Sequence, residues 1–197
     1  MKNFWDERFA VDEYVYGTEP NAFFKQELEK LKPGILLMPG EGEGRNAVFA
    51  ATLGWTVTAF DPSVEGKKKA EKLAGSKKVS IKYLTYDYEN IQLPMDYFDC
   101  IGLVYTHMPS SKRQEYHRKL ISFLKPGGHV IMECFSKEQI HNNTGGPGDI
   151  SMLYSEEELQ ADFESFSEIS IVKEEISFDE GLFHKGNASV MRLIGTK

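Results

Sequence analysis

Three closely spaced glycines and a more distant aspartate form a pattern that can bind a nucleoside. An apolar run (35–38) leads to Gly40, Gly42 and Gly44, a helix-forming stretch follows (46–53), Gly54 ends it, and a second apolar run ends at Asp61. A strand, a glycine turn, a helix and a strand, with an acid about 20 residues after the first glycine, make the βαβ unit that holds a nucleoside-containing cofactor. The Asp61 carboxylate can accept two ribose hydroxyl hydrogen bonds. A tight turn without a ligand is the alternative, which Asp61 disfavours.

Two acidic residues between these glycines indicate which cofactor fits. A dinucleotide carries a pyrophosphate, which such a loop holds with backbone N–H groups and the helix dipole. Glu41 and Glu43 would place two carboxylates beside that anion, which is costly. S-adenosylmethionine has no phosphate and carries an ammonium and a sulfonium, so an acidic loop favours it over NAD-type cofactors.

The periodicity of apolar residues predicts the elements that position this loop. We expect strands near 35–38, 55–60, 79–84, 98–105 and 129–135, with helices near 21–31, 45–53 and 64–74, after Ser111, and from Ser155 to about 166. Ser63 is placed to cap helix 64–74, and Ser111-x-x-Gln114 and Ser155-x-x-Glu158 have the capping-box pattern. A turn at 126–128 precedes the fifth strand. Two longer strands, near 168–178 and 188–195, predict an antiparallel hairpin at the end of a doubly wound, Rossmann-like α/β sheet.

Candidate site residues follow from this arrangement, because ligands of open parallel sheets lie beyond the carboxyl ends of the strands, where the strand order reverses. The residues at those ends are Gly40, Glu41, Gly42, Gly44, Arg45, Asn46, Asp61, Pro62, Ser63, Asp87, Tyr88, Tyr105, His107 and Glu133. His107 can orient or deprotonate a nucleophile near neutral pH, or it is an ordinary surface histidine. Glu133 interrupts an apolar strand, so it either binds substrate or pairs with a basic neighbour.

Size and composition limit the function further. A chain of 197 residues is the size of one domain, and a formal net charge of −7 argues against nucleic-acid and anionic-membrane partners. The basic cluster of Lys67, Lys68, Lys69, Lys72, Lys77 and Lys78 is expected to be a solvated helix face. Cys100 and Cys134 lie in apolar strands and predict buried thiols, with neither a disulfide nor a metal site. The N-terminus has no signal-peptide pattern, so we expect a cytoplasmic protein. We also expect a monomer or homodimer that acts on a small molecule.

Several further segments carry a family resemblance. They are FWDERF (4–9), YVYGTEPN (14–21), the glycine loop, LKPGG (124–128), GGP (145–147) and MLY (152–154). In these the chain resembles the class I S-adenosylmethionine-dependent methyltransferases, and within them the small, single-domain tellurite-resistance-type and thiopurine-type branch. The resemblance implies a sheet order of 3-2-1-4-5-7-6 with the last strand antiparallel, and a single domain over 1–197 with an N-terminal cap (1–33) and a core (34–197).

The resemblance also implies roles for individual residues. Asp87 matches the acidic contact to the adenine amino group, although a turn aspartate bonded to its own backbone is the alternative. Pro62 and Ser63 flank the ribose or adenine, and His107 lies where the cofactor methionine meets the substrate. The N-terminal aromatic residues form a cap in which Tyr16 contacts the cofactor or closes the substrate pocket, unless they are an ordinary helix on the sheet edge. His184 lies in a Glu-Gly-x-x-His-x-Gly segment whose role stays open.

The chain departs from this family at the end of the first strand. The family's strand usually ends Asp-Leu-Gly-Cys-Gly, whereas this one ends Met-Pro-Gly-Glu-Gly (38–42). The residue that often orients the cofactor ammonium is therefore missing. Glu41 or Glu43 is the candidate substitute.

Three functions remain open at this stage. The first is a small-molecule methyltransferase, in which the protein holds a nucleophile roughly 3–3.5 Å from the methyl group and excludes water. A thiol or chalcogen acceptor needs little general base, whereas an amine or hydroxyl needs help that His107 or Glu133 can supply. The second is a nicotinamide-dependent oxidoreductase, and the third a non-catalytic module that binds S-adenosylmethionine.

Overall fold

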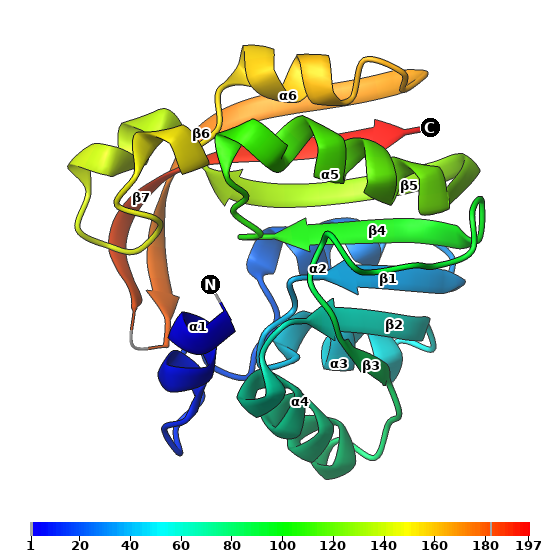
Figure 1. Ribbon diagram of the computed structural model, residues 1–197, viewed down its shortest axis with the longest axis vertical. Helices are drawn as coiled ribbons and strands as arrows, with labels where there is room; N and C mark the ends of the chain where they lie inside the picture. Colours follow the sequence, from blue (N-terminus) through cyan, green and yellow to red (C-terminus); the bar gives the residue numbers. More distant parts are fainter. Residues whose placement is uncertain (1, 182) are drawn as a thin grey trace.

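A computed structural model describes residues 2–181 and 183–197, in which one seven-stranded sheet is covered by helices on both faces (Figure 1). The strand order is β3-β2-β1-β4-β5-β7-β6, as the family resemblance implied. The strands are β1 (Ile35–Pro39), β2 (Thr56–Asp61), β3 (Lys82–Thr85), β4 (Phe98–Val104), β5 (Leu124–Phe135), β6 (Glu168–Glu180) and β7 (His184–Thr196). β1 to β5 are parallel, and β7 is antiparallel to both β5 and β6.

The helices connect and cover these strands. The α-helices are α1 (Lys2–Phe9), α2 (Ala22–Leu28), α3 (Arg45–Thr52), α4 (Val64–Ser76), α5 (Ser110–Phe123) and α6 (Glu156–Asp162), and two short 3₁₀ helices follow β5, η1 (Lys137–His141) and η2 (Ile150–Met152). The end of β5 and the segment after η2 meet in a parallel bridge between Ser136 and Tyr154. This segment therefore lies beside the carboxyl ends of the central strands.

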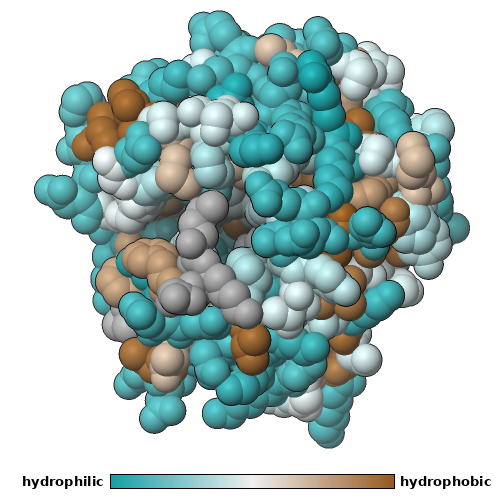
Figure 2. Space-filling model, viewed as in Figure 1, coloured by the Kyte–Doolittle hydropathy of each residue, from teal (hydrophilic) through white to brown (hydrophobic). Residues whose placement is uncertain are grey.

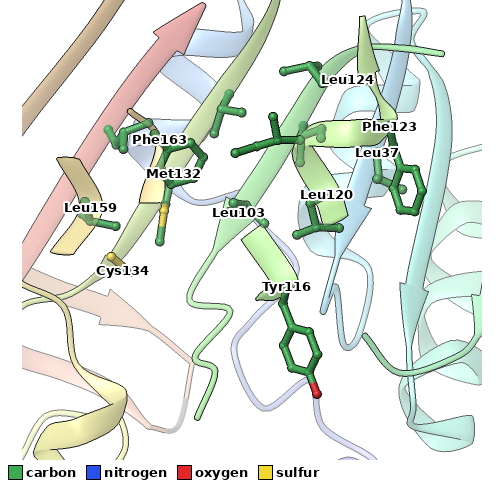
Figure 3. Packing of buried hydrophobic residues seen from close by; sticks show 14 of the residues in the cluster. Leu37, Leu103, Tyr116, Leu120, Phe123, Leu124, Met132, Cys134, Leu159 and Phe163 are labelled. Atoms are coloured by element: carbon green, nitrogen blue, oxygen red, sulfur yellow. The ribbon is translucent and has the colours of Figure 1, made fainter. Parts of the chain in front are cut away.

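Each central strand is apolar on both sides because both faces of the sheet are covered. In β1, Leu37 belongs to the cluster under α5 and α6, while Leu36 and Met38 belong to the cluster under α2 and α3. Figure 3 shows part of the first cluster, in which side chains of α5 and α6 converge on those of β4 and β5. Alternate residues therefore stabilise opposite layers, which fixes the register of β1 between β2 and β4.

Local capping signals were right in two places and wrong in one. The Ser63 hydroxyl accepts a hydrogen bond from the backbone N–H of Gly66, and Ser155 with Glu158 forms a complete capping box. The predicted box at Ser111 does not form. Helix α5 begins at Ser110 after Pro109, so Ser111 already lies inside the first turn and cannot cap it.

The fifth strand also differs from the prediction. It begins at Leu124 rather than at His129 and includes the expected Pro-Gly-Gly turn. Its pairing with β4 is irregular there, because Phe98 lies opposite Leu124 and Cys100 lies opposite His129. The turn residues thus form an irregularity inside a strand.

Other predicted features are confirmed. Both cysteines are buried free thiols, and β6 and β7 form the antiparallel hairpin. Over the described part of the chain, none of the helices has the length and apolar character that a bilayer crossing needs.

Candidate active site

The candidate site lies beyond the carboxyl ends of the parallel strands, near α1 and the tip of the β6–β7 hairpin (Figure 1). Figure 2 shows this face of the molecule, which is mainly hydrophilic and has a hollow near its centre. A cavity of about 310 Å³ is lined by residues of α1, of the loop around 143–146 and of the hairpin. The site therefore combines segments from the beginning, middle and end of the chain.

The glycine loop brings backbone close to two other elements. Gly40 has φ +59° and Gly44 has φ +88°, both in the left-handed region that favours glycine. A Cβ atom on Gly44 would lie 2.5 Å from the Cβ of Ala70 in α4, and one on Gly40 would lie 2.7 Å from the hydroxyl oxygen of Tyr88. Glycine is therefore required at Gly44 by the packing of α3 against α4, and at Gly40 by the tyrosine beside the strand end.

The Glu41 side chain forms hydrogen bonds with the backbone of the chain itself. Its Oε1 accepts hydrogen bonds from the backbone N–H groups of Asn46 and Ala47, at 2.9 and 2.7 Å, so it caps α3. The residue is 8% exposed, and burial raises the pKa of its carboxyl to about 7, although the Ala47 N–H and Arg45 lower it. Its predicted contact with the cofactor ammonium stays a prediction.

Glu43 ties the glycine loop to the N-terminal segment. Its Oε2 accepts from the backbone N–H groups of Val15 and Tyr16, and its Oε1 lies 2.7 Å from the Lys69 ammonium. Lys69 also donates to the carbonyl oxygen of Glu13, and its side chain is only 12% exposed. The expectation of a fully solvated lysine face is therefore wrong at Lys69, because this lysine faces the glycine loop and not water.

Asp61 lies where a ribose ligand is expected, but its two oxygens already accept backbone hydrogen bonds. Oδ2 accepts from Gly42 N–H at 3.2 Å and Oδ1 from Ser63 N–H at 2.8 Å. Asp61 is 6% exposed, and burial raises the pKa of its carboxyl to about 6. From α1, Asp6 accepts a hydrogen bond from the Ser63 hydroxyl, so α1 is attached beside the end of β2. Pro62, which lies between Asp61 and Ser63 in the chain, is partly buried.

Two buried hydroxyl groups mark the ends of β3 and β4. The Tyr88 and Thr106 hydroxyls are buried next to Gly40, where they interact with each other and with no other polar group of the described residues. The ring of Tyr88 packs between Phe60 and Tyr116. Two hydroxyls that have only each other keep unused hydrogen-bonding capacity, so their position marks a place where a polar ligand would be favourable.

Asp87 is exposed and makes local contacts. Its Oδ1 accepts from the backbone N–H and the side-chain amide of Asn90. The structure thus shows the turn that was the alternative interpretation. The adenine contact of Asp87 stays a prediction.

Glu133 is the centre of a buried network. Its Oε1 accepts from the Tyr105 hydroxyl at 2.5 Å and from the Asn21 amide at 2.6 Å, while its Oε2 lies 2.6 Å from Arg192 Nε. Glu133 is 1% exposed and so has the basic partner of the second interpretation. Asn46 supports the network from the glycine-loop side, because its Oδ1 accepts from the backbone N–H of Asn21. Tyr105 has φ +53°, a strained value for a tyrosine at the end of β4.

His107 is held in a defined tautomer. Its Nδ1 lies 2.9 Å from the carbonyl oxygen of Met152, which can only accept, so Nδ1 carries the proton. Nε2 is buried and has no hydrogen-bond partner among the described residues. Burial lowers the pKa of His107 to about 4, and the imidazole stacks on Phe135. His107 therefore presents a neutral nitrogen lone pair at the end of β4.

His184, on the hairpin, lines the cavity. His184 Nδ1 lies 3.4 Å from Glu180 Oε2, and the same oxygen is 2.9 Å from Arg45 Nη2. Arg45 also donates to the carbonyl oxygen of Tyr16, so the first residue of α3 joins the hairpin to the N-terminal segment. Burial lowers the pKa of His184, and its ring packs against Tyr16 and Tyr105.

Sequence reasoning missed three residues that build this site. Arg8 lines the cavity, Asn21 bonds Glu133 across 112 residues of chain, and Arg192 pairs with Glu133 across 59. Arg8 and Asn21 both lie in segments that carried the family resemblance, which was the available signal. Nothing in the sequence around Arg192 indicated its partner.

Comparison with known proteins agrees with this geometry. Residues 37–128 match the sequence model of a family described as Methyltransferase domain. A search of curated proteins gave no match. The fold is similar to an S-adenosylmethionine-dependent methyltransferase from Methanosarcina mazei, with 17% identity, a TM-score of 0.72, and coverage of 91% of this chain and 98% of that one.

Two further solved structures are similar. TehB from Haemophilus influenzae has 16% identity and a TM-score of 0.70, with 100% of this chain and 66% of that chain covered. A possible histamine N-methyltransferase from Thermotoga maritima has 20% identity and a TM-score of 0.64, with coverage of 99% and 95%. At these identities the likeness establishes the fold, which is that of class I S-adenosylmethionine-dependent methyltransferases. Together with the matched segment, this fold implies S-adenosylmethionine as the cofactor.

The residues at the strand ends fit this cofactor. The hydroxyls of Tyr88 and Thr106, which have only each other as partners, lie beside the Gly40 backbone, where a ligand rich in polar atoms can bond to them. Each oxygen of Asp61 accepts one hydrogen bond and has a second lone pair for a ribose hydroxyl. A pyrophosphate is disfavoured here, because Glu41 occupies the backbone N–H groups of Asn46 and Ala47 at the start of α3.

Proposed function

We propose that this protein is a methyltransferase that transfers the methyl group of S-adenosylmethionine to a small-molecule acceptor. The observation that carries this proposal is a group of buried polar atoms at the ends of β3 and β4, on the switch point of a methyltransferase fold: the Tyr88 and Thr106 hydroxyls, which interact only with each other, and the His107 Nε2, which has no partner among the described residues. When bound, the cofactor supplies an activated methyl group. The chain itself must then hold the acceptor in line with that group and keep water away.

The size of the cavity supports a small acceptor. A cavity of about 310 Å³ is at the lower end of the range for small-molecule pockets. Cofactor groups are expected along the glycine loop, Asp61, Asp87 and Tyr88. The acceptor is then expected on the side of His107, the hairpin and the 143–146 loop.

His107 is the candidate base on the acceptor side. Its Nε2 lone pair has no protein partner, and its low pKa keeps the imidazole neutral at physiological pH. Such a nitrogen can accept a hydrogen bond from an acceptor N–H, O–H or S–H group, although its low basicity makes it a weak base for full proton removal. An acceptor that ionises readily fits best. We therefore favour a thiol or chalcogen species, which is also what the resemblance to the tellurite-resistance-type and thiopurine-type branch implies.

Glu133 contributes through other residues. Its carboxylate fixes the hydroxyl of Tyr105 and the amide of Asn21, and Tyr105 adopts a strained backbone conformation directly before Thr106 and His107. We infer that Glu133 is a positioning residue for this turn and that it does not touch the acceptor.

Calorimetry and a methyl-transfer screen test the proposal. We expect S-adenosylmethionine and S-adenosylhomocysteine to bind and NADH not to bind. A screen over thiols, chalcogen oxyanions, amines and phenols should then find turnover with a small acceptor. Tighter binding of NADH would contradict the cofactor assignment. Binding of S-adenosylhomocysteine without turnover on any acceptor class would favour a non-catalytic binding module.

A further inference from the structure

Arg8 of α1 lines the cavity, and its guanidinium lacks an acidic partner. Nη1 donates a hydrogen bond to the Tyr16 hydroxyl at 2.9 Å, and the group lies over the rings of Phe4 and Phe183, 4.6 Å from each centroid. Within the described chain, Arg8 forms no ion pair with a carboxylate. Aromatic rings hold this partly buried cation in place and leave most of its N–H donors unused.

Three other cations near the site are neutralised by the chain. Arg45 pairs with Glu180 at 2.9 Å, Lys69 with Glu43 at 2.7 Å, and Arg192 with Glu133 at 2.6 Å. Arg8 differs from them in a protein whose net charge is −7. A partly desolvated guanidinium gains most from a charge-assisted bond to an anion, in bidentate geometry where it can form.

The cavity offers further donors for an anion. Besides Arg8 it is lined by Asn143, His184 and Lys185, and its lining among the described residues contains no carboxylate. Glu41, Glu43 and Asp61 of the glycine-loop side are not among the residues that line this cavity. An anionic group in the cavity is thus attracted to the Arg8 side.

We propose that Arg8 binds a carboxylate or similar oxyanion in this cavity. The proposal rests on the proposed function, and two groups have the required chemistry. One is the methionine carboxylate of the cofactor, and the other is an anionic group of the acceptor. In both cases Arg8 orients one reactant relative to the methyl group.

Ligand pairs that differ in one charge separate these two sources. Arg8→Gln removes the charge, Arg8→Lys keeps it without the planar fork, and Arg118→Gln is the matched control, an exposed arginine on α5. Calorimetry compares S-adenosylhomocysteine with its carboxyl methyl ester for each variant. If Arg8 binds the cofactor, Arg8→Gln lowers the affinity for S-adenosylhomocysteine at least tenfold and the affinity for its methyl ester less than twofold. The affinity of Arg8→Lys for S-adenosylhomocysteine then falls between those of wild type and Arg8→Gln.

Steady-state kinetics covers the second source. If Arg8 binds the acceptor, Arg8→Gln leaves S-adenosylhomocysteine affinity within twofold and raises KM at least tenfold for an anionic acceptor, with KM unchanged for its neutral analogue. The melting temperature of each variant checks that it is folded. If neither the affinity nor KM responds in folded Arg8→Gln, the proposal is wrong. Absence of S-adenosylhomocysteine binding by the wild type would instead contradict the proposed function, before any variant is made.

Discussion

The two sides of the candidate site differ in how far the chain satisfies its own polar groups. On the glycine-loop side, Glu41, Glu43 and Asp61 accept backbone hydrogen bonds, and Lys69 neutralises one of them. On the hairpin side, the His107 Nε2 has no partner among the described residues, and the Arg8 guanidinium has no acidic partner there. The loop side is therefore preorganised, whereas the hairpin side has binding capacity left for a ligand.

This difference follows from the cost of burying polar groups. A buried carboxylate without donors would be unstable, so the acidic loop that suits a cationic cofactor must also bind its own backbone. Donors and acceptors without partners persist where a ligand satisfies them in the working protein. Substitutions on the loop side should therefore reduce stability, and those on the hairpin side should mainly reduce binding or turnover.

The largest effect is expected at Gly44. In Gly44→Ala the new Cβ would lie 2.5 Å from the Ala70 Cβ and 2.8 Å from its Cα, at a residue with φ +88°. We expect the free energy of unfolding to fall by about 4 kcal/mol, because overpacking adds to the backbone penalty. Gly54→Ala is the control, since its φ is +91° and it has nothing within 4 Å; it should lose about 1 kcal/mol. Equal losses in urea denaturation would show that α3 and α4 are not tightly packed at Gly44.

The buried Asp61 should make stability depend on pH. Burial raises its pKa in the folded protein to about 6, from an ordinary value of 3.8. Its contribution to stability is thus fully present below pH 3.8 and is lost as the pH rises through about 6, where the buried carboxyl ionises. Between these limits the change is roughly 3 kcal/mol. The stability difference between wild type and Asp61→Asn, measured by urea denaturation from pH 4 to 7, should change by about this amount and become constant above pH 7. A difference that is independent of pH would contradict the raised pKa.

Breaking the Glu133 network should reduce stability somewhat less than Gly44→Ala does. Glu133→Gln weakens a buried ion pair, but Arg192 retains Glu174, with which it also pairs. We expect a loss of about 2–3 kcal/mol. Glu65→Gln breaks the exposed pair with Lys68 and should change stability by no more than about 0.5 kcal/mol. If Glu133 positions Tyr105, turnover should fall while the affinity for S-adenosylhomocysteine stays near that of wild type. Comparable stability losses in the two variants would argue against a buried network.

His107 provides the smallest expected change in free energy and the most specific one. His107→Ala should slow transfer to an amine or hydroxyl acceptor by roughly ten- to a hundredfold, because it removes a hydrogen-bond acceptor at the reacting group. A thiol or chalcogen acceptor should respond less. Affinity for S-adenosylhomocysteine should stay within about 0.5 kcal/mol of wild type. His141→Ala, an exposed histidine in η1, is the control. A collapse of cofactor affinity, or turnover unaffected by the change, would place the acceptor elsewhere.

Local sequence signals were sufficient where an interaction spans a few residues. The glycine loop, the Ser63 cap and the Ser155 box were predicted because each depends on neighbours within one turn. The predicted capping box at Ser111 was wrong, because Pro109 shifts the start of α5. The sheet order needed the family resemblance in addition, since periodicity shows which residues are buried but not which strands are adjacent.

The sequence by itself determined the βαβ unit, the acidic character of its loop and the strand ends at which a ligand would lie, because these follow from backbone conformation and from the alternation of apolar residues. Only the tertiary structure decided what the side chains at those ends do. Glu133 meets Asn21, Tyr105 and Arg192, and Arg8 reaches the hairpin, through contacts between segments far apart in the chain. Such pairings depend on how helices pack and on which charges become buried together, and that information is distributed over the whole folded chain.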